Sequence, residues 1–232
     1  MSKQGVEALT IAIEGNLAVS GLWQPAKRAR ACYVLAHGAG AGMRHPFLEA
    51  AAAQLAAQGI ETLRYQFPYM ERGSKRPDPP KLCHATVRAA VSEAARHTDA
   101  PLLAGGRSFG GRMTSQAQAE SPLAGVHGLV FLGFPLHPAK KPSDERAKHL
   151  LDVQIPMLFL QGTRDELAAL DLLERVTNGL GARATLKLFE GADHSFHVPA
   201  RSGRTDADIL AGVVVAIADW ADQRQSTAPK RP

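Results

Sequence analysis

The chain has 232 residues, of which 45% are hydrophobic and 21% are charged, and its formal net charge is +5. A chain of this length and composition can bury one sizeable core, so we expect a folded protein rather than a disordered one. The positive residues are spread along the chain, with no arginine-rich helix and no basic stripe between aromatics, which argues against a nucleic-acid partner. The longest apolar runs, such as residues 209–218, are about half the roughly 20 residues that span a bilayer, which argues against a membrane partner.

The N-terminal sequence, the cysteines and the histidines indicate the compartment and the chemistry. MSKQGVEALT lacks the apolar core of a secretory signal peptide. Cys32 and Cys83 have no metal-ligand spacing and fit a reducing compartment. The nine histidines are scattered without an H-E-x-x-H or similar group. We therefore expect a cytoplasmic protein with no catalytic metal and no other cofactor.

The hydrophobic pattern predicts strands that alternate with helices. Two short alternating segments, ALTIAIEG and LAVSGLWQP, flank Glu14-Gly15-Asn16 and predict a hairpin. Buried strands are predicted at ACYVLAHG, IETLRYQF, PLLAGG, HGLVFLGF, IPMLFLQG and ATLKLFEG. Helices are predicted at PFLEAAAAQLAAQG, residues 81–97, SFGGRMTSQAQAE, DELAALDLLERVTNG and DADILAGVVVAIADWADQ.

This order predicts an α/β fold with a mostly parallel central sheet. Right-handed βαβ units place helices on both faces of such a sheet, and the opening hairpin would add antiparallel edge strands. We expect a single domain over residues 1–223. The last residues, 224–232, are predicted to form a disordered tail.

Gly106-Arg107-Ser108-Phe109-Gly110 has the G-x-S-x-G spacing of a nucleophile elbow and lies between a predicted strand and a predicted helix. An elbow holds its serine in a strained backbone conformation, and small neighbours let strand and helix approach closely. Ser108 is therefore the candidate nucleophile. The alternative is a serine that caps the helix of an ordinary βα turn.

A serine nucleophile needs a histidine base and a carboxylate that fixes the tautomer of the histidine. Asp165 and His194 follow Ser108 in the chain order of this fold, each just past the end of a predicted strand. Three alternatives stay open. Asp165 could cap the helix that follows it, Asp193 could replace it as the acid, and His197 could replace His194 as the base.

The glycine-rich loop of residues 37–42, HGAGAG, follows the first predicted parallel strand. It lacks the G-K-[ST] ending of a P-loop and the spacing of a dinucleotide site, so an oxyanion loop is the better interpretation. We expect the N–H groups of Ala39 and Phe109 to form the oxyanion hole.

Six motifs in order, LAHGAGAGMRHPF, LRYQFPYME, GGRSFGGRM, FLGFPLHP, FLQGTRDEL and GADHSF, resemble the α/β-hydrolase fold. More narrowly, the chain resembles the hydrolase-like domain of testis-expressed protein thirty and of the third subunit of the NSL histone-acetyltransferase complex. It is more distantly similar to dienelactone hydrolases, which normally carry cysteine at the nucleophile. The resemblance covers residues 31–220 and implies Ser108, Asp165 and His194 at the triad positions.

The segment 135–154, where this fold usually carries its lid, is too short for a deep helical cap, so we expect a short or absent lid. Many basic residues are predicted in loops at the strand ends: Arg44, His45, Arg64, Arg72, Lys75, Arg76, Arg107, Lys140 and Lys141. They are either solvated loop charges or a positive funnel for an anionic substrate. The leading hypothesis is a serine hydrolase that cleaves a small-molecule carboxylic ester, thioester or lactone. The alternative is a non-catalytic scaffold for protein interaction.

Overall fold

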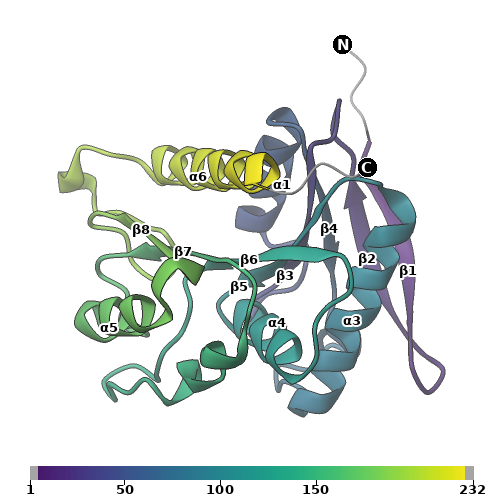
Figure 1. Cartoon of the computed structure of the whole chain (residues 1–232), viewed down its shortest axis with the longest axis horizontal. Coiled ribbons are helices and arrows are strands. Elements are labelled where there is room, and N and C mark those ends of the chain that lie inside the picture. The colour runs from purple at the N-terminus through teal and green to yellow at the C-terminus, as the bar shows by residue number, and fades with distance from the viewer. Residues whose placement is uncertain (1–4, 228–232) are drawn as a thin grey trace.

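The computed structural model describes residues 5–227, with side chains up to Arg224. Its eight strands form one sheet in the order β1-β2-β4-β3-β5-β6-β7-β8 (Figure 1). The strands are β1 Glu7–Ile13, β2 Leu17–Gln24, β3 Ala31–Ala36, β4 Ile60–Tyr65, β5 Leu102–Arg107, β6 Val126–Leu132, β7 Met157–Gly162 and β8 Ala184–Phe189.

Two pairings are antiparallel and the others are parallel. β1 pairs with β2, and β2 with β4, in antiparallel register, whereas β4, β3, β5, β6, β7 and β8 run parallel. Gly15 and Asn16 both have positive φ in the β1–β2 turn, which matches the twist that a tight hairpin needs. The predicted hairpin and the predicted mostly parallel sheet are both confirmed.

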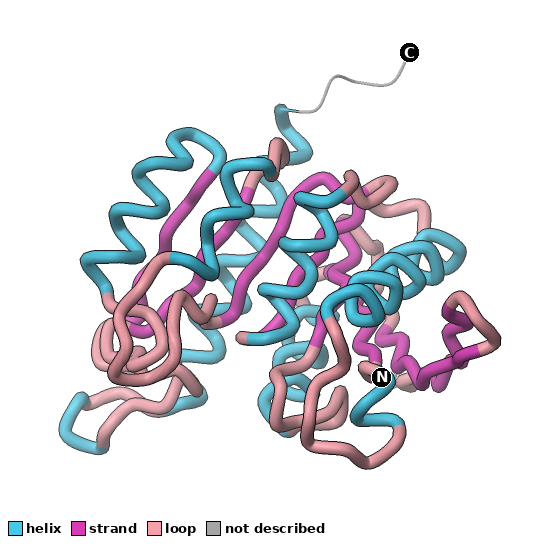
Figure 2. Tube along the Cα trace, turned by 90° about the horizontal axis from the view of Figure 1, so that it is seen from below, coloured by secondary structure: helices cyan, strands magenta, loops and turns pink. Residues whose placement is uncertain are grey.

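Helices cover both faces of the sheet, as predicted. The α-helices are α1 Pro46–Ala57, α2 Pro68–Glu71, α3 Pro80–His97, α4 Phe109–Glu120, α5 Leu170–Leu180 and α6 Asp206–Thr227. Short 3₁₀ helices are η1 Glu145–Asp152, η2 Gly181–Arg183 and η3 Ala200–Ser202. α1 and α6 lie on one face, and α3, α4 and α5 on the other (Figure 1). In Figure 2 the strands lie behind the helices of one face.

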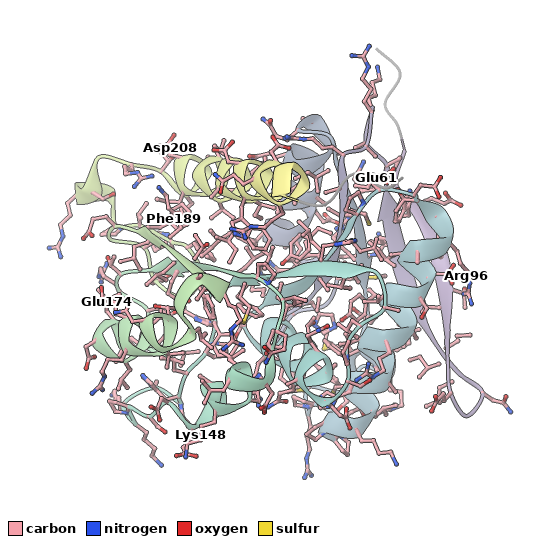
Figure 3. All side chains as sticks on the ribbon, viewed as in Figure 1. Glu61, Arg96, Lys148, Glu174, Phe189 and Asp208 are labelled. Atoms are coloured by element: carbon pink, nitrogen blue, oxygen red, sulfur yellow. The ribbon has the colours of Figure 1, made fainter. Side chains whose placement is uncertain are left out.

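Each face has its own apolar core. One core joins α1 and α6 to the sheet, and the other joins α3, α4 and α5 to it. Phe189 belongs to the first core and lies against Gly212 of α6, whereas the labelled charged side chains of Arg96, Lys148 and Glu174 lie at the periphery (Figure 3). No helix in residues 5–227 is both long and apolar enough to cross a membrane.

Two predicted helix boundaries differ from the structure. α5 starts at Leu170 and not at Asp165, because the Asp165 carboxylate accepts the Leu167 N–H at 2.8 Å and the His137 ring accepts the Ala169 N–H at 2.9 Å. These side-chain acceptors replace helical backbone hydrogen bonds. α6 continues to Thr227, so residues 224–227 of the predicted tail are helical, and residues 228–232 lie outside the described residues.

The sheet collects its functional loops at one edge. β3, β5, β6, β7 and β8 are parallel neighbours, so the loops that follow them meet at their carboxyl ends. Figure 2 shows the larger loops gathered along one edge of the molecule. Between β6 and β7 the only helix is the short η1, in agreement with the predicted short or absent lid.

Candidate active site

Ser108 lies between the last residue of β5 and the first residue of α4. Its φ is 49° and its ψ is −114°, a conformation that is strained for a residue with a side chain. The Ser108 N–H donates to the Leu132 carbonyl at 3.0 Å, which ties the turn to β6. A Cβ on Gly110 would lie 2.5 Å from the His37 carbonyl oxygen, so only glycine permits this close approach of helix and strand.

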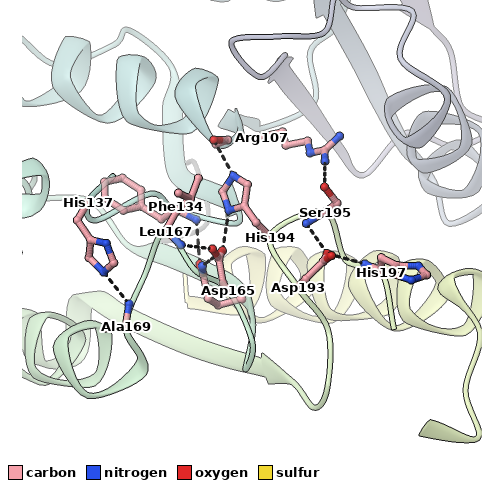
Figure 4. Close-up of polar contacts among 12 residues, drawn as sticks. Arg107, Phe134, His137, Asp165, Leu167, Ala169, Asp193, His194, Ser195 and His197 are labelled. Atoms are coloured by element: carbon pink, nitrogen blue, oxygen red, sulfur yellow. Dashed lines mark hydrogen bonds and ion pairs between the residues drawn. The ribbon is translucent and has the colours of Figure 1, made fainter. Parts of the chain in front are cut away.

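Three side chains from three loops form one hydrogen-bonded chain (Figure 4). His194 Nε2 lies 2.8 Å from Ser108 Oγ, and His194 Nδ1 lies 2.7 Å from Asp165 Oδ2. The His194 side chain is 22% exposed, whereas that of Asp165 is 0% exposed. A buried carboxylate, a half-buried imidazole and a half-buried serine in this order match the arrangement that Ser-His-Asp triads use for proton transfer.

Asp165 is held on both oxygens. Oδ2 accepts the Gln161 side-chain amide as well as His194 Nδ1–H, and Oδ1 accepts the Leu167 N–H. Gln161 is held in turn, because its Oε1 accepts the Phe134 N–H at 2.8 Å. These hydrogen bonds fix the carboxylate in the orientation that keeps the Nδ1–H tautomer of His194 and leaves Nε2 free to accept a proton.

The rival acid and base take part in other contacts. Asp193 Oδ1 accepts the N–H groups of Ser195 and His197 at 2.7 and 3.0 Å, so it caps its own loop. The His197 ring is 63% exposed and pairs with Asp206 at 2.9 Å. The structure therefore brings Asp165 and His194 to Ser108 and leaves Asp193 and His197 outside the hydrogen-bonded chain.

The loop after β3 lies beside Ser108. A Cβ on Gly38 would be 3.9 Å from the Ser108 Cβ. Among the described residues the Ala39 N–H has no intramolecular acceptor, and the Phe109 N–H opens α4, where helical N–H groups have no partner within the helix. Within residues 5–227, both N–H groups predicted to form the oxyanion hole are thus free of intramolecular acceptors and lie close to Ser108.

His37 and Tyr69 hold this loop in place. Burial lowers the pKa of His37 to about 4, so the ring is neutral at pH 7. Its Nδ1–H donates to the Gly38 carbonyl at 2.7 Å, and its Nε2 accepts the Phe67 N–H at 3.0 Å. The Tyr69 hydroxyl donates to the Ala39 carbonyl at 2.8 Å.

Comparisons with known proteins agree with this geometry. Residues 29–222 match a family described as an alpha/beta hydrolase domain. The chain belongs to this α/β-hydrolase family. Its fold is similar to that of a dienelactone hydrolase from Anabaena variabilis, with a TM-score of 0.75 and 19% identity over 96% of this chain and 99% of that one. It is also similar to a lidless α/β serine hydrolase from Xanthomonas campestris, with a TM-score of 0.73 and 20% identity over 99% and 98% of the two chains.

A second serine–histidine pair is present in this α/β hydrolase. His149 Nε2 lies 2.7 Å from Ser115 Oγ, and the Ser115 hydroxyl also contacts the Arg112 carbonyl at 2.9 Å. Ser115 is fully buried within α4, and no carboxylate of the described residues hydrogen-bonds to the His149 ring. This pair joins η1 to α4 but lacks the third group and the solvent access that a nucleophile needs.

At least three of the nine predicted basic loop residues of this hydrolase contact other groups of the chain. Arg64 is 2% exposed and donates to the Met43 carbonyl, and Arg72 pairs with Asp78 at 2.5 Å. Arg107 donates to Ser195 Oγ at 3.0 Å (Figure 4), and its guanidinium lies over the Phe47 ring. These three residues have partners within the chain, and the positive funnel for an anionic substrate stays a prediction.

Sequence reasoning missed Gln161, His37 and Tyr69 as supports of the site. A signal was present for two of them, because Gln161 and His37 are polar residues at the ends of otherwise apolar buried strands. Buried polar groups require partners. Within residues 5–227 no group of three or more His, Cys, Asp or Glu side chains is placed to bind a metal.

Proposed function

We propose that the protein is a serine hydrolase that cleaves a small-molecule carboxylic ester, thioester or lactone through an acyl-enzyme. The observation that carries the proposal is the hydrogen-bonded chain from Ser108 Oγ through His194 to Asp165. Its serine has a strained positive φ. Such strain persists where a turn serves a function. The serine-hydrolase relatives support the same chemistry.

The geometry supports a two-step mechanism. His194 Nε2 takes the proton of Ser108 as Oγ bonds to the substrate carbonyl carbon, and the N–H groups of Ala39 and Phe109 stabilise the resulting oxyanion. Asp165 stabilises the imidazolium through Nδ1–H. The tetrahedral intermediate collapses, and His194 gives its proton to the departing alkoxide or thiolate. Water then attacks the acyl-enzyme with His194 as base, and the acid and the Ser108 hydroxyl are released.

The proposal also covers the narrower family group, the compartment and the type of enzyme. The motifs HGAGAG, GGRSFGG and GTRDEL support membership of the group that includes testis-expressed protein thirty and the NSL-complex third subunit. We propose a cytoplasmic enzyme of the carboxylesterase or thioesterase type that works without a cofactor. The other candidate is a scaffold that has kept the fold. A scaffold has no physical need for an aligned acid, base and serine, so the hydrogen-bonded chain favours the enzyme.

A fluorophosphonate probe tests the proposal directly. The probe should phosphonylate Ser108 in the folded protein, as located by mass spectrometry of the labelled peptide. Ser108→Ala should abolish labelling and ester hydrolysis, with an unchanged circular dichroism spectrum. Ser115→Ala is the matched control, because it removes the other serine that contacts a histidine, and it should still be labelled. Failure of the folded wild type to react, beside a reactive known serine hydrolase, favours the scaffold.

A further inference from the structure

Arg112 lies one helical turn after Ser108. Its backbone N–H donates to the Ser108 carbonyl at 3.1 Å, and residues four apart on a helix have Cβ atoms about 5–6 Å apart. The guanidinium carbon lies 5.8 Å from the centre of the Phe109 ring. Phe109 follows the candidate nucleophile and is a proposed oxyanion donor, so Arg112 lies against the side chain of a residue that borders the candidate site.

The Arg112 side chain has no acceptor within the described part of the chain. It takes part in no ion pair and in no side-chain hydrogen bond, and its Nε is buried without a partner. Three other half-buried or buried arginines differ, because Arg64, Arg88 and Arg107 each donate to an oxygen. A guanidinium that loses water without gaining an acceptor is costly.

A second unpaired arginine lies next to it. The Ser115–His149 hydrogen bond of 2.7 Å joins α4 to η1. Arg112 precedes Ser115 by three residues on the α-helix, and Arg146 precedes His149 by three residues on the 3₁₀ helix. Residues three apart share a face on both kinds of helix, so both arginines are on the faces that meet. Arg146 is half-buried and forms no ion pair with any described residue.

The charges of the two arginines act on each other. Burial lowers the pKa of the Arg112 guanidinium, and the positive charge of Arg146 lowers it further. Arg112 also contributes, after burial, to the lowered pKa of His149. An anion between the two guanidinium groups would relieve this repulsion and supply the missing acceptor.

We propose that Arg112 and Arg146 bind a carboxylate of the substrate, on the acyl side of the ester that Ser108 attacks. The inference rests on the proposed function and adds the substrate class. Paired guanidinium groups suit a planar carboxylate, which can accept two parallel N–H bonds. The short segment between β6 and β7 contributes Arg146 through η1, so it takes part in substrate recognition without forming a lid.

Half-esters of dicarboxylic acids test this site. The probes are the mono-4-nitrophenyl esters of succinic and glutaric acid, each compared with its neutral isostere in which the distal carboxyl is a carboxamide. The wild type should show a kcat/KM ratio of charged to neutral ester of about ten or more, since one charge-assisted hydrogen bond corresponds to about a ten-fold change. Arg112→Gln and Arg146→Gln should each lower this ratio about ten-fold through KM, and Arg112→Lys should retain part of it.

Lys140→Gln with Lys141→Gln is the matched control. Both lysines are exposed, and their removal lowers the net charge by two units, whereas each single arginine-to-glutamine variant lowers it by one. The control should keep the wild-type ratio. If it loses as much as the arginine variants, a diffuse field explains the preference and the inference is wrong.

The remaining outcomes separate the two proposals. Hydrolysis of neutral esters with a ratio near one would overturn the carboxylate site and leave the serine hydrolase intact. A wild type that neither reacts with the fluorophosphonate nor cleaves any ester would overturn both. Should Arg112→Gln fail to fold, Arg146→Gln decides alone, and an unchanged ratio in that variant contradicts the proposal.

Discussion

Asp165 is the residue at which the hydrogen bonds of the site meet. It accepts His194 Nδ1–H and the Gln161 amide on one oxygen and a backbone N–H on the other. A carboxylate with this many donors stays in one orientation, and it transmits that orientation to the imidazole. Asp193 also accepts two N–H groups, but both come from its own loop, so its hydrogen bonds order that loop only.

Substitutions should separate the two acid–base pairs. We expect Asp165→Asn and His194→Ala each to lower kcat on a neutral ester by on the order of 10³ or more, because members of a triad act as one unit. Asp193→Asn and His197→Ala should cost far less, since neither residue joins the chain to Ser108. Steady-state kinetics of the four folded variants checks this order, and the reverse order would assign the acid and base to residues 193 and 197.

Several single residues of the site could be predicted from the sequence, and others could not. Ser108, Asp165 and His194 come just after predicted strands, and the parallel sheet brings such positions to one edge. Their proximity follows from topology alone. The Arg112–Arg146 pair depends on which faces of α4 and η1 meet, and no spacing in the sequence contains that information.

The junction of β5 and α4 is the element on which the candidate site depends most. Gly110 packs so closely on the loop after β3 that an added Cβ would lie 2.5 Å from the His37 oxygen and 2.8 Å from the Ala36 carbonyl carbon. Backbone atoms cannot yield as a flexible side chain can, so a methyl group there would push α4 away from the sheet. Ser108 and the Phe109 N–H would move with the helix.

Gly110→Ala should therefore impair both stability and activity. We expect a loss of about 1–3 kcal/mol in the free energy of unfolding, measured by urea titration, and a clear fall in kcat. Gly179→Ala is the matched control, because Gly179 is within α5 and a Cβ there meets nothing within 4 Å. That change should stabilise the protein by about 0.5–1 kcal/mol through helix propensity. Equal behaviour of the two variants would contradict the packing argument.

The element boundaries show where local sequence stops being informative. The helical spacing of apolar residues begins at residue 167, upstream of the observed start of α5 at Leu170. Periodicity alone gives no information on the hydrogen bonds by which Asp165 and His137 accept the N–H groups of residues 167 and 169. At the C-terminal end of α6, the polar residues 224–227 are predicted to belong to a disordered tail, but in the structure they extend the helix. Helix propensity carries a helix past the last residue that packs on the core.

At the scale of the whole molecule, buried His37 and half-buried His149 join segments that are distant in sequence. His37 connects the loop after β3 to the Phe67 N–H at the start of α2, and His149 connects η1 to α4 through Ser115. Burial lowers the pKa of each ring to about 4. The sequence shows nine histidines, and only the packing of the whole chain determines which of them are buried.

These histidines should make stability depend on pH. The pKa of His37 falls from 6.5 in the unfolded chain to about 4 in the folded one, so between these values the unfolded state binds more protons than the folded state. The stabilisation is complete above pH 6.5 and is lost as pH falls toward 4, by on the order of 3 kcal/mol for the fully buried His37. Urea titrations of the wild type at several pH values should show a free energy of unfolding that decreases steadily as the pH is lowered from 7 to 4.5.

The slope of the free energy of unfolding against pH identifies the histidines that cause the pH dependence. His37→Gln removes one titrating ring, so the slope between pH 4.5 and 6 should decrease by up to about 1.4 kcal/mol per pH unit, even though the variant is less stable at pH 7. His149→Gln should act in the same direction. His127, exposed on β6, is the control, and His127→Gln should keep the wild-type slope. If His37→Gln keeps it as well, the protonation of His37 does not contribute to acid unfolding, and the neutral ring inferred for the loop beside Ser108 would be incorrect.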